Sequence, residues 1–170
     1  RLDIGRNHTA THILQSALRA VLGEHVQQRG SLVAPERLRF DFSHLSALSP
    51  EEVRKVQRIV NDRIRQNLPV SAQELPYKQA IAQGVTALFD EKYGDVVRVL
   101  SIGEPAISAE LCGGTHLTAT GEIGYFHILS ETSIGTGLRR IEALTGRGAE
   151  EYIEKSFATW QELAGKLGAT

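Results

Sequence analysis

The sequence predicts an α+β fold, with a largely antiparallel sheet and packed helices. Residues 7–22 and 49–67 each carry apolar side chains at intervals of three and four, which is typical of helices that bury one face. Residues 37–44 alternate between polar and apolar side chains, and residues 96–100 are rich in valine, as is typical of strands. Because such helices bury their apolar face against a sheet, we expect both of them on one face of it.

The N-terminal half is predicted as a helix, a hairpin and a second helix. The first helix, at residues 7–22, has Asn7 as a plausible N-cap and Gly23 as a natural stop. In the hairpin, residues 31–33 are expected to pair with the alternating run across a turn at Pro35. The second helix has a strong start signal, because Ser49 can cap it, with proline at the first helical position and glutamate at the third.

Short strands and a terminal helix are expected in the second half. An extended piece lies between the two prolines at 69 and 76, and a weak helix is predicted at residues 78–83. Strands are predicted at residues 96–100, 107–111, 125–129 and 138–144. From 149 to 167 the pattern is helical but only loosely amphipathic. We therefore divide the chain into a domain at residues 1–149 and a C-terminal helix at 150–170, the start of a linker or coiled segment.

The composition indicates an ordinary soluble domain, with 170 residues, 41% of them hydrophobic and 23% charged. No run approaches about 18 apolar residues, so a membrane span is excluded. A single cysteine excludes an internal disulfide and suits a reducing compartment such as the cytoplasm. The start at Arg1 and the absence of methionine indicate a piece excised from a longer protein. The oligomeric state stays open.

The net charge of −1 argues against a domain that holds a long nucleic-acid duplex through its phosphates. The same charge is compatible with a domain that handles only the single-stranded tip of an RNA, where few phosphates need neutralising.

Two short motifs, about a hundred residues apart, carry metal-binding side chains. His8 and His12 are four residues apart, which on a helix puts them on one face roughly 5–6 Å apart. Cys112 and His116 have the same spacing, but the tandem glycines between them favour a tight turn that brings both toward one point. One thiolate and three imidazoles are the ligands that zinc prefers. The two motifs together predict a zinc site.

Four ligands leave two interpretations open. They would close a tetrahedral structural site, whereas a catalytic site needs an exchangeable position. The glutamate that follows the first histidine in zinc peptidases is absent, so their general base is missing. Glu110 and Glu142 are candidates for that role, although a solvated surface position is the favoured interpretation of each. The glycines of 134–138 are interpreted as a β-turn rather than a phosphate cradle.

The chain resembles the editing domain of alanyl-tRNA synthetase over residues 1–149. The resemblance rests on the strings at 7–14 and 110–116, which carry the two metal motifs, and extends through 25–33, 37–44, 87–95, 120–124 and 139–146. Free-standing alanyl-tRNA editing proteins and a domain of threonyl-tRNA synthetase are related. The resemblance implies the fold of the second additional domain of threonyl and alanyl-tRNA synthetases, with a core sheet and a smaller lobe at about residues 69–85.

The resemblance also implies a function, namely hydrolysis of seryl and glycyl esters at the 3′ acceptor end of tRNA specific for alanine. It implies Zn²⁺ as cofactor, bound by His8, His12, Cys112 and His116, and the rest of a synthetase as partner. This chain has no ATP-binding motif, so it is not expected to charge tRNA itself. The alternative is a non-catalytic, zinc-stabilised module that binds tRNA.

Four further groups are candidates for substrate contacts. A site that hydrolyses a seryl ester and spares an alanyl ester must have polar groups that alanine leaves unpaired. Thr9, beside the metal ligands, and Gln28, which matches a pocket glutamine of the family, are the expected catalytic-pocket residues. Gly114 and the pair Arg139 and Arg140 are expected to contact the substrate or the terminal phosphates of the tRNA, although a solvent-facing arginine pair is the other interpretation.

Overall fold

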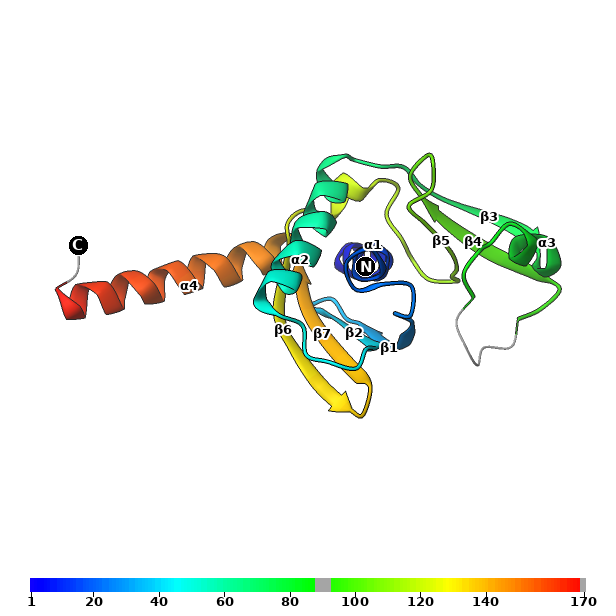
Figure 1. Ribbon diagram of the computed structural model, residues 1–170. Coiled ribbons are helices and arrows are strands. Elements are labelled where there is room, and N and C mark those ends of the chain that lie inside the picture. The colour runs from blue at the N-terminus through cyan, green and yellow to red at the C-terminus, as the bar shows by residue number, and fades with distance from the viewer. Residues whose placement is uncertain (88–92, 169–170) are drawn as a thin grey trace.

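Helix α1 (Leu2–Leu22) packs against two separate antiparallel sheets in the computed structural model, which describes residues 1–87 and 93–168 (Figure 1). The first sheet has the strand order β1-β2-β7-β6 and the second the order β3-β4-β5. The strands are β1 (Gln28–Val33), β2 (Leu38–Ser43), β3 (Val70–Pro76), β4 (Val96–Ile102), β5 (Ser108–Leu111), β6 (Phe126–Gly135) and β7 (Leu138–Thr145). The other helices are α2 (Pro50–Arg65), α3 (Tyr77–Ala82), a 3-10 turn η1 (Thr120–Ile123) and α4 (Gly146–Leu167).

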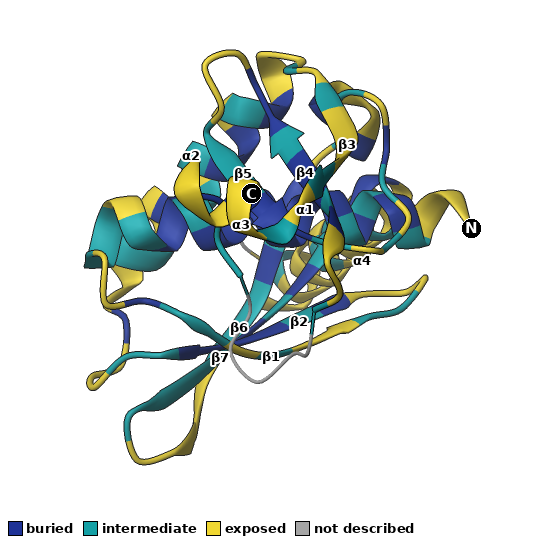
Figure 2. Cartoon of the chain, turned by 90° about the vertical axis from the view of Figure 1, so that its right-hand side faces the viewer, coloured by how far each residue is buried: buried dark blue, intermediate teal, exposed yellow. Residues whose placement is uncertain are grey.

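The α+β class is confirmed, and the main core lies where it was expected. The alternating run of β2 turns Leu38, Phe40 and Phe42 inward, and all three are fully buried. Apolar residues of α1 and α2 join the same cluster, in which Ile13 and Val60 are also fully buried. Figure 2 shows buried stretches on both helices. Both helices therefore cover the same face of the four-stranded sheet.

The start of α2 follows its sequence signal. Ser49 Oγ accepts a hydrogen bond from Glu52 N, and Glu52 Oε2 accepts one from Ser49 N, which completes a capping box. The prediction that Asn7 caps α1 is wrong, because the helix begins at Leu2. Asn7 is buried inside it, where its amide donates to Ala34 O and accepts from the Thr145 hydroxyl. The residue resembles an N-cap in sequence but connects α1 to the first sheet.

The smaller lobe is larger than expected. Strands β3 and β4 and helix α3 enclose a second apolar cluster around Ala80, Val97 and Val99, separate from the main core. Strand β5 belongs to the same sheet, so the lobe extends from about 69 to 111 rather than from 69 to 85. Of the stretch 87–95 on which part of the resemblance rests, residues 88–92 lie outside the described part of the chain.

Helix α4 projects from the body of the molecule (Figure 1). It begins at Gly146, three residues before the expected start, and ends at Leu167. Residues 169–170 of the expected C-terminal segment lie outside the described residues. Phe157 and Trp160 on this helix are 65% and 71% exposed. Within residues 1–87 and 93–168, no helix combines the length and apolar character that crossing a bilayer requires.

Candidate metal centre

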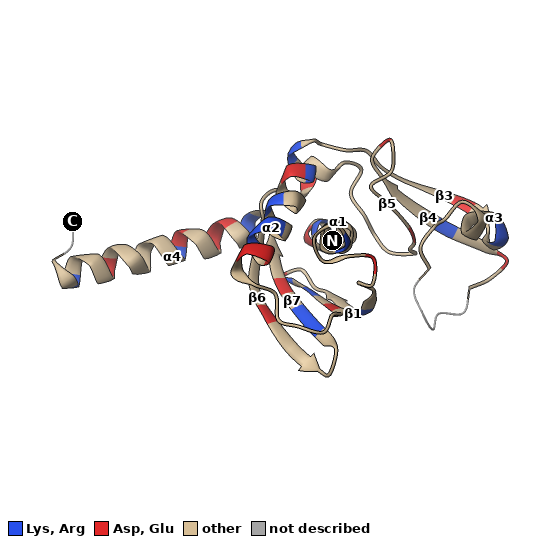
Figure 3. Cartoon of the chain, viewed as in Figure 1, with Lys and Arg blue, Asp and Glu red and all other residues tan. Residues whose placement is uncertain are grey.

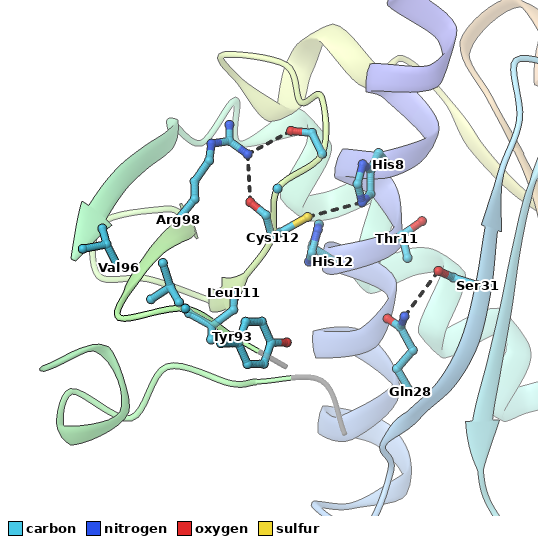
Figure 4. A pocket seen from close by; sticks show the side chains of 14 residues that line it. His8, Thr11, His12, Gln28, Ser31, Tyr93, Val96, Arg98, Leu111 and Cys112 are labelled. Atoms are coloured by element: carbon cyan, nitrogen blue, oxygen red, sulfur yellow. Dashed lines mark hydrogen bonds between the residues drawn. The ribbon is translucent and has the colours of Figure 1, made fainter. Parts of the chain in front are cut away.

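Two distant segments of the chain meet at the four expected metal ligands. His8 and His12 lie one turn apart on α1, with ring centroids 5.3 Å from each other. Cys112 and His116 come from the loop that leaves β5, and one ligand atom from each of the four side chains lies within 4.8 Å of all the others. Figure 4 shows Cys112 pointing from that loop toward His8.

Two of the separations between ligand atoms are close to those expected around a small tetrahedral ion. Cys112 Sγ lies 3.4 Å from His8 Nε2 and 3.2 Å from His116 Nε2. A tetrahedral ion with bonds of about 2.0–2.3 Å separates its ligands by about 3.3–3.8 Å. His12 contributes a further sign, because its Nε2 is buried and has no hydrogen-bond partner. Since buried ring nitrogens seldom lack a partner, this orphaned atom fits a metal ligand.

Electrostatics favour the ionised thiol. Burial by itself raises the pKa of Cys112, but hydrogen bonds from the surrounding histidines outweigh burial and lower the pKa to about 3 from an ordinary value of 9.0. Burial likewise opposes charge on His12, yet the Cys112 sulfur and the Glu110 carboxylate raise its pKa to about 9. The pKa of His116 is lowered, mainly by burial. The thiolate that a soft divalent ion requires is therefore already present at neutral pH.

The loop that carries Cys112 and His116 is held by an arginine. Arg98 on β4 donates from Nη1 to the backbone oxygens of Cys112 and Gly114, each at 2.8 Å (Figure 4). A Cβ built on Gly114 would overlap the His8 ring, whereas one built on Gly113 would meet nothing within 4 Å. Neither glycine has a positive φ. Gly114 is thus required for close approach to His8, not for an unusual backbone conformation.

Thr9 lies behind a metal ligand and not on the wall of the cavity. It is fully buried, accepts a hydrogen bond from Leu117 N at 3.1 Å, and has its hydroxyl 3.4 Å from His116 Nδ1. Thr9 is not among the described residues that line the cavity, and its expected role in substrate discrimination stays a prediction. On a helix, the residue after His8 is rotated about a quarter turn away, which directs Thr9 toward the His116 loop.

A cavity of about 520 Å³ opens beside the four expected metal ligands, between β1 and the smaller lobe. His8, His12 and Cys112 line it, and the expected pocket residue Gln28 borders it from β1. Gln28 Nε2 donates to Ser31 Oγ at 3.3 Å, so both polar side chains lie together on that wall (Figure 4). The volume falls within the range of about 300–1,000 Å³ that is typical of small-ligand sites.

The expected arginine pair lies outside the cavity lining. Arg139 makes a two-pronged ion pair with Glu131, and Arg140 makes one with Asp41. These contacts raise the pKa of both guanidinium groups. Both α2 and α4 carry acidic as well as basic residues (Figure 3), and α2 has Glu51 and Glu52 in its first turn and Arg63 and Arg65 in its last. Charges already paired within the protein are less available to phosphates.

The sequence interpretation missed three features of the site. Glu110 is only 5% exposed and bonds to His12, so its interpretation as a solvated surface residue is wrong. Glu142 is half-buried, and its Oε1 lies 3.5 Å from Arg37 Nε. Arg98, which lines the cavity from the smaller lobe, carried no motif by which the sequence could have singled it out, and Tyr93, which also lines the cavity, lies in the stretch 87–95 of the resemblance but was not identified as a site residue.

The family model and similar known proteins both point to alanyl-tRNA synthetases. The profile of the threonyl and alanyl tRNA synthetase second additional domain matches residues 97–142, which include Cys112 and His116. An alanine–tRNA ligase of Dehalococcoides mccartyi is 65% identical over 170 residues, which is 100% of this chain and 20% of that protein. The alanine–tRNA ligase of Carboxydothermus hydrogenoformans is 59% identical over 95% of this chain and 18% of its own length. That of Chloroflexus aurantiacus is 55% identical over 98% of this chain and 20% of its own length. The resemblance to alanyl-tRNA synthetase is confirmed, and the chain spans about a fifth of the length of these curated relatives.

Proposed function

We propose that this chain, which carries the second additional domain of threonyl and alanyl tRNA synthetases, hydrolyses seryl and glycyl esters at the 3′ acceptor end of tRNA specific for alanine. It would act as the editing part of an alanine–tRNA ligase, in the cytoplasm, with the rest of the synthetase and the tRNA as partners. The observation that carries the proposal is a cavity of aminoacyl-nucleoside size whose wall includes three of the four metal-binding side chains.

The metal is proposed to be Zn²⁺, held by His8, His12, Cys112 and His116. Zinc bound there would supply a Lewis acid that attracts the amino or carbonyl group of the ester. The thiolate and three ring nitrogens present the charge and softness that this ion prefers. Of the four side chains, His12 is buried and the other three are intermediate in exposure. An ion held there would therefore be within reach of a substrate in the cavity.

Gln28 is the residue that we propose to recognise the serine hydroxyl. Its amide borders the cavity and, among the described residues, is paired only with Ser31, whose own hydroxyl can rotate to serve a ligand. A seryl ester offers a hydroxyl that both side chains can bond, whereas an alanyl ester leaves them without that partner. One such bond is worth about 1–3 kcal/mol, which is enough to separate the two substrates by about 5- to 150-fold.

Deacylation by the isolated chain tests the proposal. We expect Ser-tRNA and Gly-tRNA specific for alanine to be hydrolysed and Ala-tRNA to be spared. A chelator or Cys112→Ala should lower the seryl rate by about 100-fold or more, the usual cost of a lost electrostatic stabiliser, while Glu150→Gln, a change at an exposed carboxylate on α4, should not. Equal rates with and without the metal would contradict the proposal.

One observation favours the second candidate, a non-catalytic zinc-stabilised module that binds tRNA. Among the described residues that line the cavity, none is an aspartate or a glutamate, so no carboxylate is placed to act as a general base. This candidate predicts that the chain binds the acceptor end without hydrolysing it. It also predicts global unfolding on metal removal, which circular dichroism would detect.

A further inference from the structure

Glu110 is the only carboxylate that the described part of the structure brings into hydrogen-bond contact with a metal-binding side chain. It lies on β5, opposite α1, and its Oε2 is 2.8 Å from His12 Nδ1. Both side chains are 7% exposed, so the contact is shielded from water. The other oxygen, Oε1, accepts a hydrogen bond from Ser108 Oγ at 2.7 Å, which orients the carboxylate.

We propose that Glu110 is a positioning residue that accepts a hydrogen bond from Nδ1 of metal-bound His12 and orients the ring, so that the lone pair of Nε2 is presented to the metal. This inference rests on the metal site proposed above, but not on the hydrolytic activity. An ionised carboxylate only accepts hydrogen bonds, so the ring nitrogen that faces it must be the donor. The lone pair of a neutral imidazole is then on the other nitrogen, and that atom is the buried Nε2 that has no protein partner.

The position of Glu110 separates this role from that of a general base. His12, Leu111 and Cys112 line the cavity beside the metal ligands, but Glu110 does not. Glu110 instead borders a different cavity, of about 410 Å³, which Gln15, Ser16 and Arg19 of α1 also line. Both oxygens of Glu110 are hydrogen-bonded, and within the described residues its contact with the four expected metal ligands is through His12.

The inference predicts how metal affinity responds to substitution. Outer hydrogen-bond partners of metal-bound histidines typically contribute 10- to 100-fold to affinity. Glu110→Gln keeps the shape and can still accept from Nδ1, so it should lower zinc affinity by about 10-fold. Glu110→Leu offers no acceptor and should lower it by about 100-fold. Glu150→Gln, an exposed carboxylate on α4, is the matched control and should leave affinity unchanged.

The experiment is a competition titration between the purified chain and a zinc chelator, followed by Co²⁺ substitution and absorption spectroscopy. A positioning role lowers affinity in the order given and alters the visible Co²⁺ bands, because the His12 ring no longer holds its angle. A purely structural role would lower the free energy of unfolding of the metal-free chain and leave both readouts at the control value, which would overturn the inference.

Two features keep the outcomes distinguishable. If Glu110→Leu fails to fold, the isosteric Glu110→Gln still decides, because unchanged zinc affinity in that folded variant contradicts the proposal. Metal affinity is also measured without tRNA. A chain that hydrolyses no ester, yet loses zinc affinity on substitution of Glu110, would refute the proposed function and leave this inference standing.

Discussion

Replacing Gly114 by alanine should dismantle the metal site while leaving the fold intact. The new Cβ would overlap Cε1 and Nδ1 of His8 and lie 3.3 Å from its Nε2. Gly114 has no positive φ, so alanine brings no backbone strain, and the whole perturbation is this collision with the ring. The His8 ring and the loop face each other directly, so one of them must move.

The distance by which His8 or the loop must move sets the expected loss of zinc affinity. Carbon atoms pack at about 3.5–4.0 Å, so relieving the overlap requires a shift on the order of 1 Å. Metal–ligand distances tolerate only about 0.2 Å. If His8 moves, one ligand is lost, and if the loop moves, Cys112 and His116 are displaced. Since even outer partners contribute up to about 100-fold, we expect zinc affinity to fall by at least about 100-fold, or about 2.7 kcal/mol.

A chelator competition titration on the folded variant measures this effect. Gly113→Ala is a close control, because a Cβ at position 113 would meet no other atom within 4 Å. We expect neither variant to change its helix and strand content. Wild-type zinc affinity in a folded Gly114→Ala chain would refute the reasoning, as would an equal loss in Gly113→Ala, since the collision with His8 would then not be the cause.

Three further substitutions probe the pocket, the support of the ligands and the fold. Thr9→Val leaves the buried Leu117 N–H without its acceptor, so denaturant unfolding should show a loss of about 1–3 kcal/mol, and an unchanged midpoint would contradict that contact. Gln28→Leu should lower the seryl-tRNA deacylation rate by about 5- to 150-fold at unchanged zinc content, and equal rates would remove Gln28 from the pocket account. Ser49→Ala removes the cap of α2 and should cost about 1 kcal/mol in thermal or denaturant unfolding, with no effect on zinc binding.

Local patterns in the sequence were sufficient for much of the fold. The spacing of His8 and His12 predicted two rings on one helical face, and the ring centroids lie 5.3 Å apart. The signals around Ser49 predicted the start of α2, and the alternation through Phe40 predicted which side of β2 is buried. Each of these features depends on residues within one or two turns, which helical and strand periodicity relate directly.

Local patterns were misleading where a residue serves a distant partner. Asn7 has the composition of an N-cap, but its amide bonds across to Ala34 and Thr145. Glu110 resembles a solvated glutamate, yet it is buried against His12, a residue 98 positions away. An isolated polar residue carries the same local signal in water and in a buried network, and only the packing of α1 against β5 distinguishes the two.

The sequence by itself determined which side chains are candidate metal ligands and how His8 and His12 are spaced, because i and i+4 geometry follows from the helix alone. The tertiary structure decided that the His8–His12 pair meets the Cys112–His116 pair. It likewise decided that the strands form two sheets and not one, and that α1 packs against both. It also decided that Gly114 must lack a Cβ and that Arg98 holds the loop. These contacts join residues that are far apart in the chain or belong to different elements. Their geometry is set by how whole elements pack, which no local periodicity encodes.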